Sequence, residues 1–229
     1  MLFSLVTHHS VLRRRLAGLD PTYQETKIVN LRLAANALDG ILIRPGEVLS
    51  FWDRVGEPTA RRGFAPGLVL HRGEVAIDIG GGLCQMSNLL YWMALHTQLT
   101  VMEQHHHGFD PFPDDERIQP FGSGASVFYN YGDLRLLNTT GATCQIRVLL
   151  TDTDLVGSIR CDQMPPTDTI VEERNHRFWR AADGKVYRDN ELWQVTTDRA
   201  SGARLGSRLI TRNHALVKYS VPDNLIASG

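Results

Sequence analysis

Residues 67–95 read GLVLHRGEVAIDIGGGLCQMSNLLYWMAL, and this stretch decides the fold class because it contains a strand pattern followed by a helix pattern. Apolar residues alternate with other residues over 75–79, which predicts a β-hairpin with Arg72-Gly73 at its turn. The pattern becomes helical over 83–96. Three consecutive glycines, 80–82, therefore lie where a strand ends and a helix begins.

The segments on either side add one further helix and many strands. Apolar residues at helical spacing predict an amphipathic helix over 24–39, which Gly40 ends. The other expected elements are a hairpin over 41–52 around Pro45-Gly46, a strand at 99–103, a long surface loop over 107–124, strands within 125–138 and 144–161, and C-terminal hairpins with turns at Asp183-Gly184 and Ser201-Gly202. This order predicts an α+β fold: a strand-rich domain with one amphipathic N-terminal helix, one buried helix after the glycine-rich turn, and C-terminal β-hairpins.

Pro165-Pro166 is the expected domain boundary, because this dipeptide separates the main strand-rich region from the C-terminal hairpins. We therefore expect a main domain over 1–164. Residues 165–229 would then be a C-terminal β-hairpin extension packed on it.

Composition excludes several classes of protein. Lysine and arginine total 24 against 25 acidic residues, so the net charge of −1 gives no reason to expect nucleic acid as a partner. The N-terminal apolar run is too short for a signal peptide, and no stretch approaches the length of a transmembrane helix. Three cysteines without a CxxC pair suggest neither a disulfide framework nor a thiolate zinc site. We expect a soluble, cytoplasmic protein in a reduced compartment, with no cofactor.

The glycine turn is the first candidate site. A glycine-rich turn before a helix presents backbone N–H groups at the positive end of the helix dipole, which suits an anionic ligand or an oxyanion. Cys84, Ser87, Asn88 and Tyr91 share one stripe of the predicted helix, which we expect to line a cleft. The candidate ligand-binding residues in this region are Gly80, Gly81, Gly82, Gln85, Ser87 and Asn88.

Cys84 is the candidate nucleophile, because a first-turn cysteine has its thiol pKa lowered by the helix N-terminus. The residues EQHHHGFD, 103–110, supply His105, His106 and His107 as candidate bases. Asp110 or Asp133 would orient the imidazole, as the third member of a catalytic triad does.

Two other interpretations stay open. His105 and His107 alternate on a predicted strand and would ligate a metal with Asp110, His176 or His214. In the plainer structural interpretation, the glycines form a tight turn, Cys84 is a small buried residue, and Ser87 and Asn88 are simply less buried.

The segments RPGEVLSFWDRVGEPTARRGFAPGLVLHRGEVAIDIGGGLCQMSNLLYWMAL (44–95), EQHHHGFDPFPD (103–114) and PFGSGASVFYNYGDLRLLN (120–138) closely resemble the VanW family. The resemblance extends from about residue 8 to the C-terminus. It implies an association with glycopeptide resistance and the cell envelope, without implying a particular reaction. Glu103 and His107 match the family's E-R-x-x-H-S pattern, whereas Gln104 and Gly108 replace its arginine and serine. Glu103 joins the candidate ligand-binding residues on this basis.

Three functional hypotheses follow. The preferred one is a binding module whose glycine turn and Cys84 region hold an anionic, peptide-like ligand such as a cell-wall precursor. The second is an acyltransferase or hydrolase that uses Cys84 as nucleophile, His107 as base and Asp133 as the orienting carboxylate. The third is a metal site at His105, His107 and Asp110. The sequence predicts a small-molecule or peptide-like partner and does not identify a protein partner.

Overall fold

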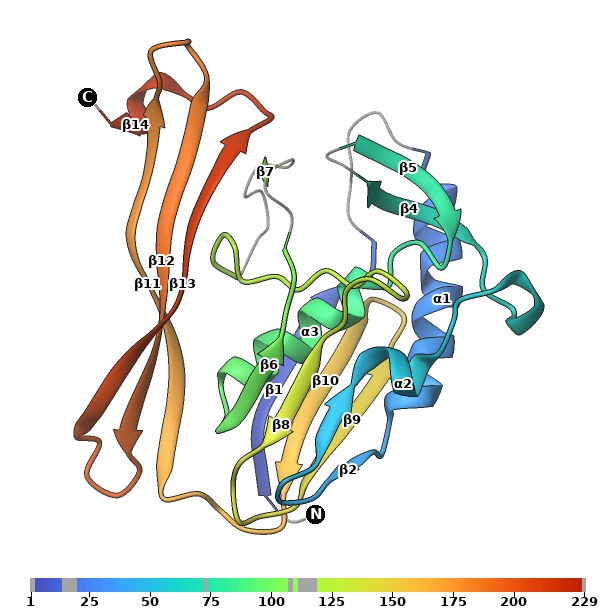
Figure 1. Cartoon of the computed structure of the whole chain (residues 1–229), viewed down its shortest axis with the longest axis vertical. Helices are drawn as coiled ribbons and strands as arrows, with labels where there is room; N and C mark the ends of the chain where they lie inside the picture. Colours follow the sequence, from blue (N-terminus) through green and yellow to red (C-terminus); the bar gives the residue numbers. More distant parts are fainter. Residues whose placement is uncertain (1–2, 14–19, 72–73, 107–108, 111–118, 228–229) are drawn as a thin grey trace. The chain divides into compact units, whose positions relative to one another are not determined.

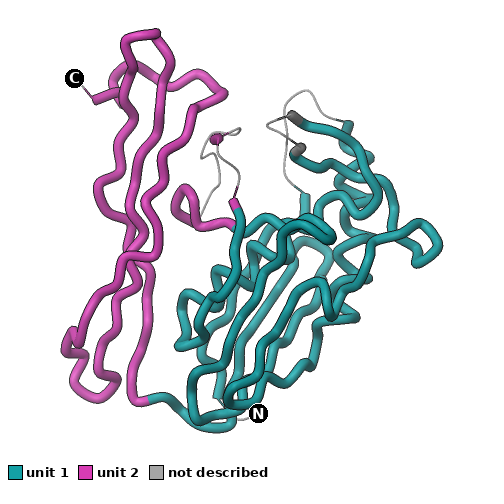
Figure 2. The backbone as a smooth tube through the Cα atoms, viewed as in Figure 1, with its two compact units in different colours: residues 1–105, 125–165 teal, residues 106–124, 166–229 magenta. Residues whose placement is uncertain are grey.

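The computed structural model describes residues 3–13, 20–71, 74–106, 109–110 and 119–227. The chain forms two compact units (Figure 2). Unit 1 contains residues 1–105 and 125–165, and unit 2 contains 106–124 and 166–229. The unit that holds the C-terminal strands thus also takes in a segment from the middle of the chain. Each unit is described by itself below.

Unit 1 is built on a four-stranded antiparallel sheet with the strand order β1-β10-β9-β2 (Figure 1). These strands are β1 (Phe3–Val11), β10 (Asp154–Cys161), β9 (Cys144–Leu150) and β2 (Leu42–Ile43). Helix α3 (Cys84–Leu95) packs against β1 and β10, and helix α1 (Thr22–Leu38) packs against β9. Alternate residues of the sheet, such as Ile146 and Ile159, are fully buried under these helices. This contact is the core of unit 1, and the predicted helices and the strands over 144–161 are confirmed.

Two smaller sheets complete unit 1. One has the strand order β3-β8-β6, formed by β3 (Val48–Ser50), β8 (Arg135–Asn138) and β6 (Leu99–Glu103). The other is the predicted hairpin, in which β4 (Pro66–His71) pairs antiparallel with β5 (Glu74–Ile79). The predicted turn residues of this hairpin, 72–73, lie outside the described residues. Short helices α2 (Phe51–Val55) and η1 (Ala60–Arg62) connect these elements.

The hairpin predicted over 41–52 is wrong, although its turn exists. The Glu47 N–H donates to the Arg44 carbonyl over 2.9 Å, and Gly46 has a φ of 80°, as a type II turn requires. Type II turns splay flanking strands instead of matching their twist. Accordingly β2 pairs with β9 and β3 pairs with β8, so the turn moves the chain from one sheet to another.

Unit 2 is a meander of three long antiparallel strands, β11 (Thr167–Arg180), β12 (Val186–Asp198) and β13 (Arg204–Val217). The predicted turns are confirmed, since Gly184 and Gly202 have φ angles of 82° and 70° between these strands. Two short parallel strands flank the meander: β14 (Ile226–Ala227), which follows η2 (Asp223–Leu225), and β7 (Phe109–Asp110). Strand β7 corrects the loop prediction at Phe109–Asp110, whereas 107–108 and 111–118 lie outside the described residues. The α+β, strand-rich fold class is confirmed.

Among the described residues, no helix has both the length and the apolar character needed to cross a bilayer.

Candidate functional site

The three glycines at the start of α3 allow close packing within unit 1. A Cβ on Gly81 would lie 2.1 Å from the Gly67 carbonyl carbon of β4. Gly80 and Gly82 have φ angles of 81° and 90°, and a Cβ on either would collide with the side chain of Pro58 or Lys27. The close neighbour of each glycine is therefore another part of the protein itself.

The polar groups of the glycine turn are also occupied. The N–H groups of Gly80 and Gly81 donate to the carbonyls of Ala65 and Asp78 over 3.0 and 3.2 Å. The fully buried Asn30 of α1 donates to both the Ala65 and Gly81 carbonyls over 2.9 Å. The anion cradle predicted at Gly80–Gly82 therefore has these backbone donors committed to internal hydrogen bonds, and the contacts match the plainer structural interpretation.

The polar stripe of α3 holds an extended segment of the chain. Ser87 Oγ donates to the Ala125 carbonyl over 2.6 Å, and Asn88 Oδ1 accepts from the Ala125 N–H over 2.6 Å. Tyr91, expected on the same stripe, is buried with 3% exposure. In place of a cleft, these side chains fix the chain as it enters residues 125–127. The segment 125–134 is irregular up to β8, which corrects the strand predicted there.

Gln85 ties α3 to the N-terminal strand. Its side-chain amide donates to Ser10 Oγ and to the Val11 carbonyl, both over 2.9 Å. The predicted ligand role of Gln85 is thereby replaced by a bond to the edge of β1.

Cys84 lies at the first position of α3, as predicted, and the residue is half-buried. The sulfur makes a long contact of 3.9 Å with the Val127 carbonyl. Burial raises the pKa of the Cys84 thiol, because the charged thiolate loses solvation. The expected lowering of this pKa is therefore wrong, because desolvation outweighs the backbone hydrogen bonds that lower it. The predicted base, His107, lies outside the described residues.

Asp133, predicted to orient the base, caps helix α2. Its carboxylate accepts from Ser50 Oγ over 2.5 Å and from the Trp52 N–H over 3.1 Å. Ser50 Oγ in turn accepts from the Asp53 N–H over 3.1 Å. Asp133 thus satisfies the Trp52 N–H at the start of α2, and Ser50 satisfies the Asp53 N–H.

Glu103 and His105 form a hydrogen-bonded pair that is partly exposed to solvent. Glu103 Oε1 lies 2.9 Å from His105 Nε2 and also accepts from the Asp133 N–H over 2.9 Å. The hydrogen bond with His105 lowers the pKa of the Glu103 carboxyl. The side chains of His105 and Glu103 are 42% and 34% exposed. Of the predicted site residues, these two keep a polar pair available to a ligand.

Beside this pair lies a tight turn over 128–132, here named the aromatic turn. The Phe128 and Gly132 backbones hydrogen-bond to each other in both directions over 2.9 Å, and Asn130 has a φ of 67°. Tyr129 and Tyr131 are 42% and 90% exposed.

The aromatic turn is fixed on both sides. Trp52 Nε1 donates to the Gly132 carbonyl over 2.9 Å, and the Trp52 ring meets Tyr129 edge to face at 5.5 Å. A Cβ on Gly132 would lie 3.0 Å from the His105 ring, so the aromatic turn is in contact with the Glu103–His105 pair. The sequence pattern predicts strands within 125–138 and not this turn, although Asn130 and Gly132 are typical turn residues.

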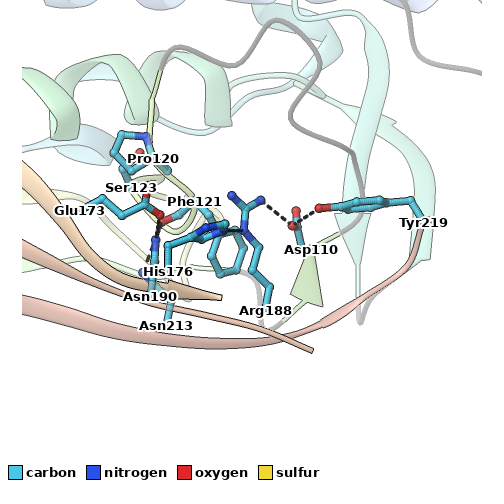
Figure 3. Close-up of polar contacts among 10 residues, drawn as sticks. All are labelled: Asp110, Pro120, Phe121, Ser123, Glu173, His176, Arg188, Asn190, Asn213 and Tyr219. Atoms are coloured by element: carbon cyan, nitrogen blue, oxygen red, sulfur yellow. Dashed lines mark hydrogen bonds and ion pairs between the residues drawn. The ribbon is translucent and has the colours of Figure 1, made fainter. Parts of the chain in front are cut away.

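Two of the metal-site candidates, Asp110 and His176, instead bond to Arg188 (Figure 3). The Asp110 carboxylate accepts from Arg188 over 3.1 Å and from the Tyr219 hydroxyl over 2.8 Å. Arg188 Nε donates to His176 over 2.9 Å, whereas His214 pairs with Asp189 over 2.8 Å. The residues that the structure describes contain no group of three or more His, Cys, Asp or Glu placed to hold a metal ion.

The comparisons with known proteins agree with the sequence resemblance. The family described as VanW like protein matches residues 26–160. The chain is 32% identical over 208 residues to the vancomycin B-type resistance protein VanW of Enterococcus faecalis, covering 91% of this chain and 75% of that protein. It is 28% identical over 121 residues to the uncharacterized protein YoaR of Bacillus subtilis, covering 52% of this chain and 37% of YoaR. No solved structure matches the chain. With most of its length aligned in this way, the chain belongs to the family of VanW-like proteins.

Proposed function

We propose that this protein contributes to vancomycin resistance as a non-covalent binding protein for a cell-wall precursor. The observation that carries the proposal is the exposed Glu103–His105 pair in contact with the aromatic turn. The likeness to a vancomycin B-type resistance protein supplies the biological setting. The ligand would then lie on the partly exposed surface beside residues 125–127, not at the glycine turn, where the Gly80 and Gly81 N–H groups are already paired.

The chemistry of this surface suits a ligand with both amide and sugar groups. The Glu103 carboxylate can accept hydrogen bonds from peptide N–H or sugar hydroxyl groups, and charge-assisted bonds of this kind are among the stronger ones. Tyr129 and Tyr131 offer apolar ring faces with a polar edge, which is typical of residues at binding surfaces. A muropeptide carries both kinds of group. Trp52 and Gly132 hold the turn in place, so little order has to be gained on binding.

We expect Tyr131→Ala and Glu103→Gln each to weaken binding of a soluble nucleotide-linked muropeptide by about tenfold. Tyr131 is 90% exposed, so its removal leaves the fold intact, and a glutamine at 103 keeps an oxygen for the Asp133 N–H. Isothermal titration of wild type and both variants gives the Kd values.

The matched control for this titration is Leu149→Ala, which removes an exposed apolar side chain from β9 of the same unit. Its Kd should equal that of wild type. Unchanged affinity in both site variants, or equal loss in the control, would refute the proposed site.

A binding role also predicts how Cys84 reacts. Because burial raises the pKa of this thiol, the folded protein should react with iodoacetamide at least about tenfold more slowly at Cys84 than the urea-unfolded chain at the same pH. The rate should rise with pH only above the range in which a free thiol ionises. Peptide mass spectrometry separates Cys84 from the other two cysteines. Fast alkylation of the folded protein near pH 7 would instead favour the cysteine enzyme.

A further inference from the structure

Two cysteines in unit 1 face each other across neighbouring strands. Strands β9 and β10 are neighbours in the sheet (Figure 1). Cys144 is the first residue of β9 and Cys161 is the last residue of β10, and the register pairs them directly. We propose that these two residues form an oxidisable dithiol that closes into a disulfide when it meets a small disulfide oxidant. This modification site is separate from the proposed binding surface and shares no residue with it.

The hydrogen-bond alternation of the ladder places this pair where cysteines come closest. The Asp162 N–H donates to the Thr143 carbonyl over 3.1 Å, and at the other end of the ladder the Thr151 N–H donates to the Asp154 carbonyl over 2.8 Å. Hydrogen-bonded and non-hydrogen-bonded residue pairs alternate along an antiparallel ladder. The pairs Thr143–Asp162 and Thr151–Asp154 are both hydrogen-bonded, so Cys144 and Cys161 form a non-hydrogen-bonded pair. Such pairs have Cα atoms about 4.5 Å apart, within the range of roughly 4.4–6.8 Å that disulfides span.

Both side chains point to the same face of the sheet. Cys144 and Cys161 are each 2% exposed and alternate along their strands in step with the buried Ile146 and Ile159. No change of strand register is needed to bring the sulfur atoms together. Because both residues are strand ends, local fraying is enough to admit a small reagent.

The two thiols already interact, and the interaction sets their order of reaction. Hydrogen bonding with the Cys161 thiol lowers the pKa of Cys144, whereas the same bond raises the pKa of Cys161. The negative charge of Asp162 opposes ionisation of both. Cys144 is therefore the thiol that ionises first and attacks.

The reaction balances with a disulfide such as oxidised glutathione. The Cys144 thiolate attacks one sulfur of the oxidant, which forms a mixed disulfide and releases one glutathione as its thiolate. Cys161 then loses its proton and attacks the Cys144 sulfur, which releases the second glutathione. The protein loses two electrons and two protons overall, and the oxidant leaves as two thiols.

The product would link the open end of the β9–β10 hairpin, opposite the turn at Thr151–Asp154. A cross-link that closes a loop of this size restricts the unfolded chain more than the folded one. We expect oxidation to raise the thermal unfolding midpoint by roughly 5–10 °C.

The test is to incubate the native protein with oxidised glutathione, remove the oxidant, and count free thiols after denaturation. The count should fall from the three cysteines of the sequence to one, with a single peptide linkage between Cys144 and Cys161 by non-reducing mass mapping. Dithiothreitol should restore all three thiols and the original unfolding midpoint.

Two variants complete the design. Cys84→Ser should still form the linkage, whereas Cys144→Ser should retain its two remaining thiols or carry only glutathione adducts. Three free thiols in oxidised wild type would overturn the proposal. A linkage that involves Cys84, or one between two chains, would overturn it equally.

Discussion

Replacing Gly81 by alanine is expected to destabilise unit 1 by at least about 4 kcal/mol, or to prevent its folding. The new Cβ would lie 2.1 Å from the Gly67 carbonyl carbon and 2.2 Å from the Gly67 oxygen, both of which are backbone atoms. Relief of this overlap requires β4 to move away from the glycine turn. That movement would also strain the hydrogen bond from Asn30 to the Gly81 carbonyl.

Urea unfolding followed by circular dichroism measures this loss, and Gly141→Ala is the matched control. Gly141 has no atom within 4 Å of the position a Cβ would take, so its replacement should change stability by less than about 0.5 kcal/mol. Gly67→Ala changes the other side of the same contact and should also destabilise, because its Cβ would lie 2.8 Å from the Gly81 oxygen. A Gly81→Ala protein as stable as Gly141→Ala would show that the glycine turn is not a packing device.

In unit 2, Arg188→Met is expected to cost about 3–5 kcal/mol, because it leaves the buried Asp110 carboxylate without its guanidinium. The two side chains are 3% and 1% exposed and lie 3.1 Å apart. The Arg188 guanidinium also stacks between Phe121 and Phe178 at 4.7 and 5.0 Å, which adds cation–π attraction in a desolvated place. Figure 3 shows Arg188 with Asp110 and Phe121.

The control for Arg188 is the same substitution at an exposed ion pair. Arg212 lies 2.9 Å from Glu191 with 72% of its side chain exposed, so Arg212→Met should cost less than about 1 kcal/mol. Fluorescence of Trp179 and Trp193 follows the unfolding of unit 2 in urea, and β11 and β12 carry these residues. Equal losses in the two variants would contradict the assigned role of Arg188.

Local sequence signals predicted much of the fold. The helix patterns over 24–39 and 83–96, the hairpin around Arg72-Gly73 and the turns at Gly184 and Gly202 depend on residues close in the chain, and the elements they predict are present. Which distant strands pair with each other is much harder to predict from the sequence. The Pro45-Gly46 turn therefore predicts a hairpin, whereas the strands on its two sides pair with β9 and β8 in different sheets.

The candidate site depended still more on distant contacts. The Cys84 thiol contacts the Val127 carbonyl, and its position at the helix N-terminus alone could not show that this distant residue would lie against it. The helical spacing of Ser87 and Asn88 predicts that they line a cleft, but both side chains hydrogen-bond to the backbone of Ala125, which is distant in the sequence. An odd number of cysteines argued against disulfides, and only the strand register shows that Cys144 faces Cys161.

These contacts give the stretch GGGLCQMS, residues 80–87, a structural explanation. Its glycines leave room for the close approach of β4 and of the Pro58 and Lys27 side chains. Gln85 hydrogen-bonds to β1, and Ser87 hydrogen-bonds to Ala125, which precedes the aromatic turn. Residues with these contacts would support the proposed binding surface at Glu103, His105 and the aromatic turn, and would not themselves contact the ligand. Substitutions within residues 80–87 should therefore lower the free energy of unfolding more than they lower the affinity for the muropeptide.

The central claim is that the ligand binds at Glu103, His105 and the aromatic turn. Amide NMR chemical shifts, recorded while a soluble nucleotide-linked muropeptide is added to the assigned protein, test it most directly. We expect the largest amide chemical-shift changes at residues 103–105 and 128–132, with small changes at Gly80–Gln85. Large shifts confined to Gly80–Gln85, with residues 103–105 and 128–132 unchanged, would contradict it and return the site to the glycine turn.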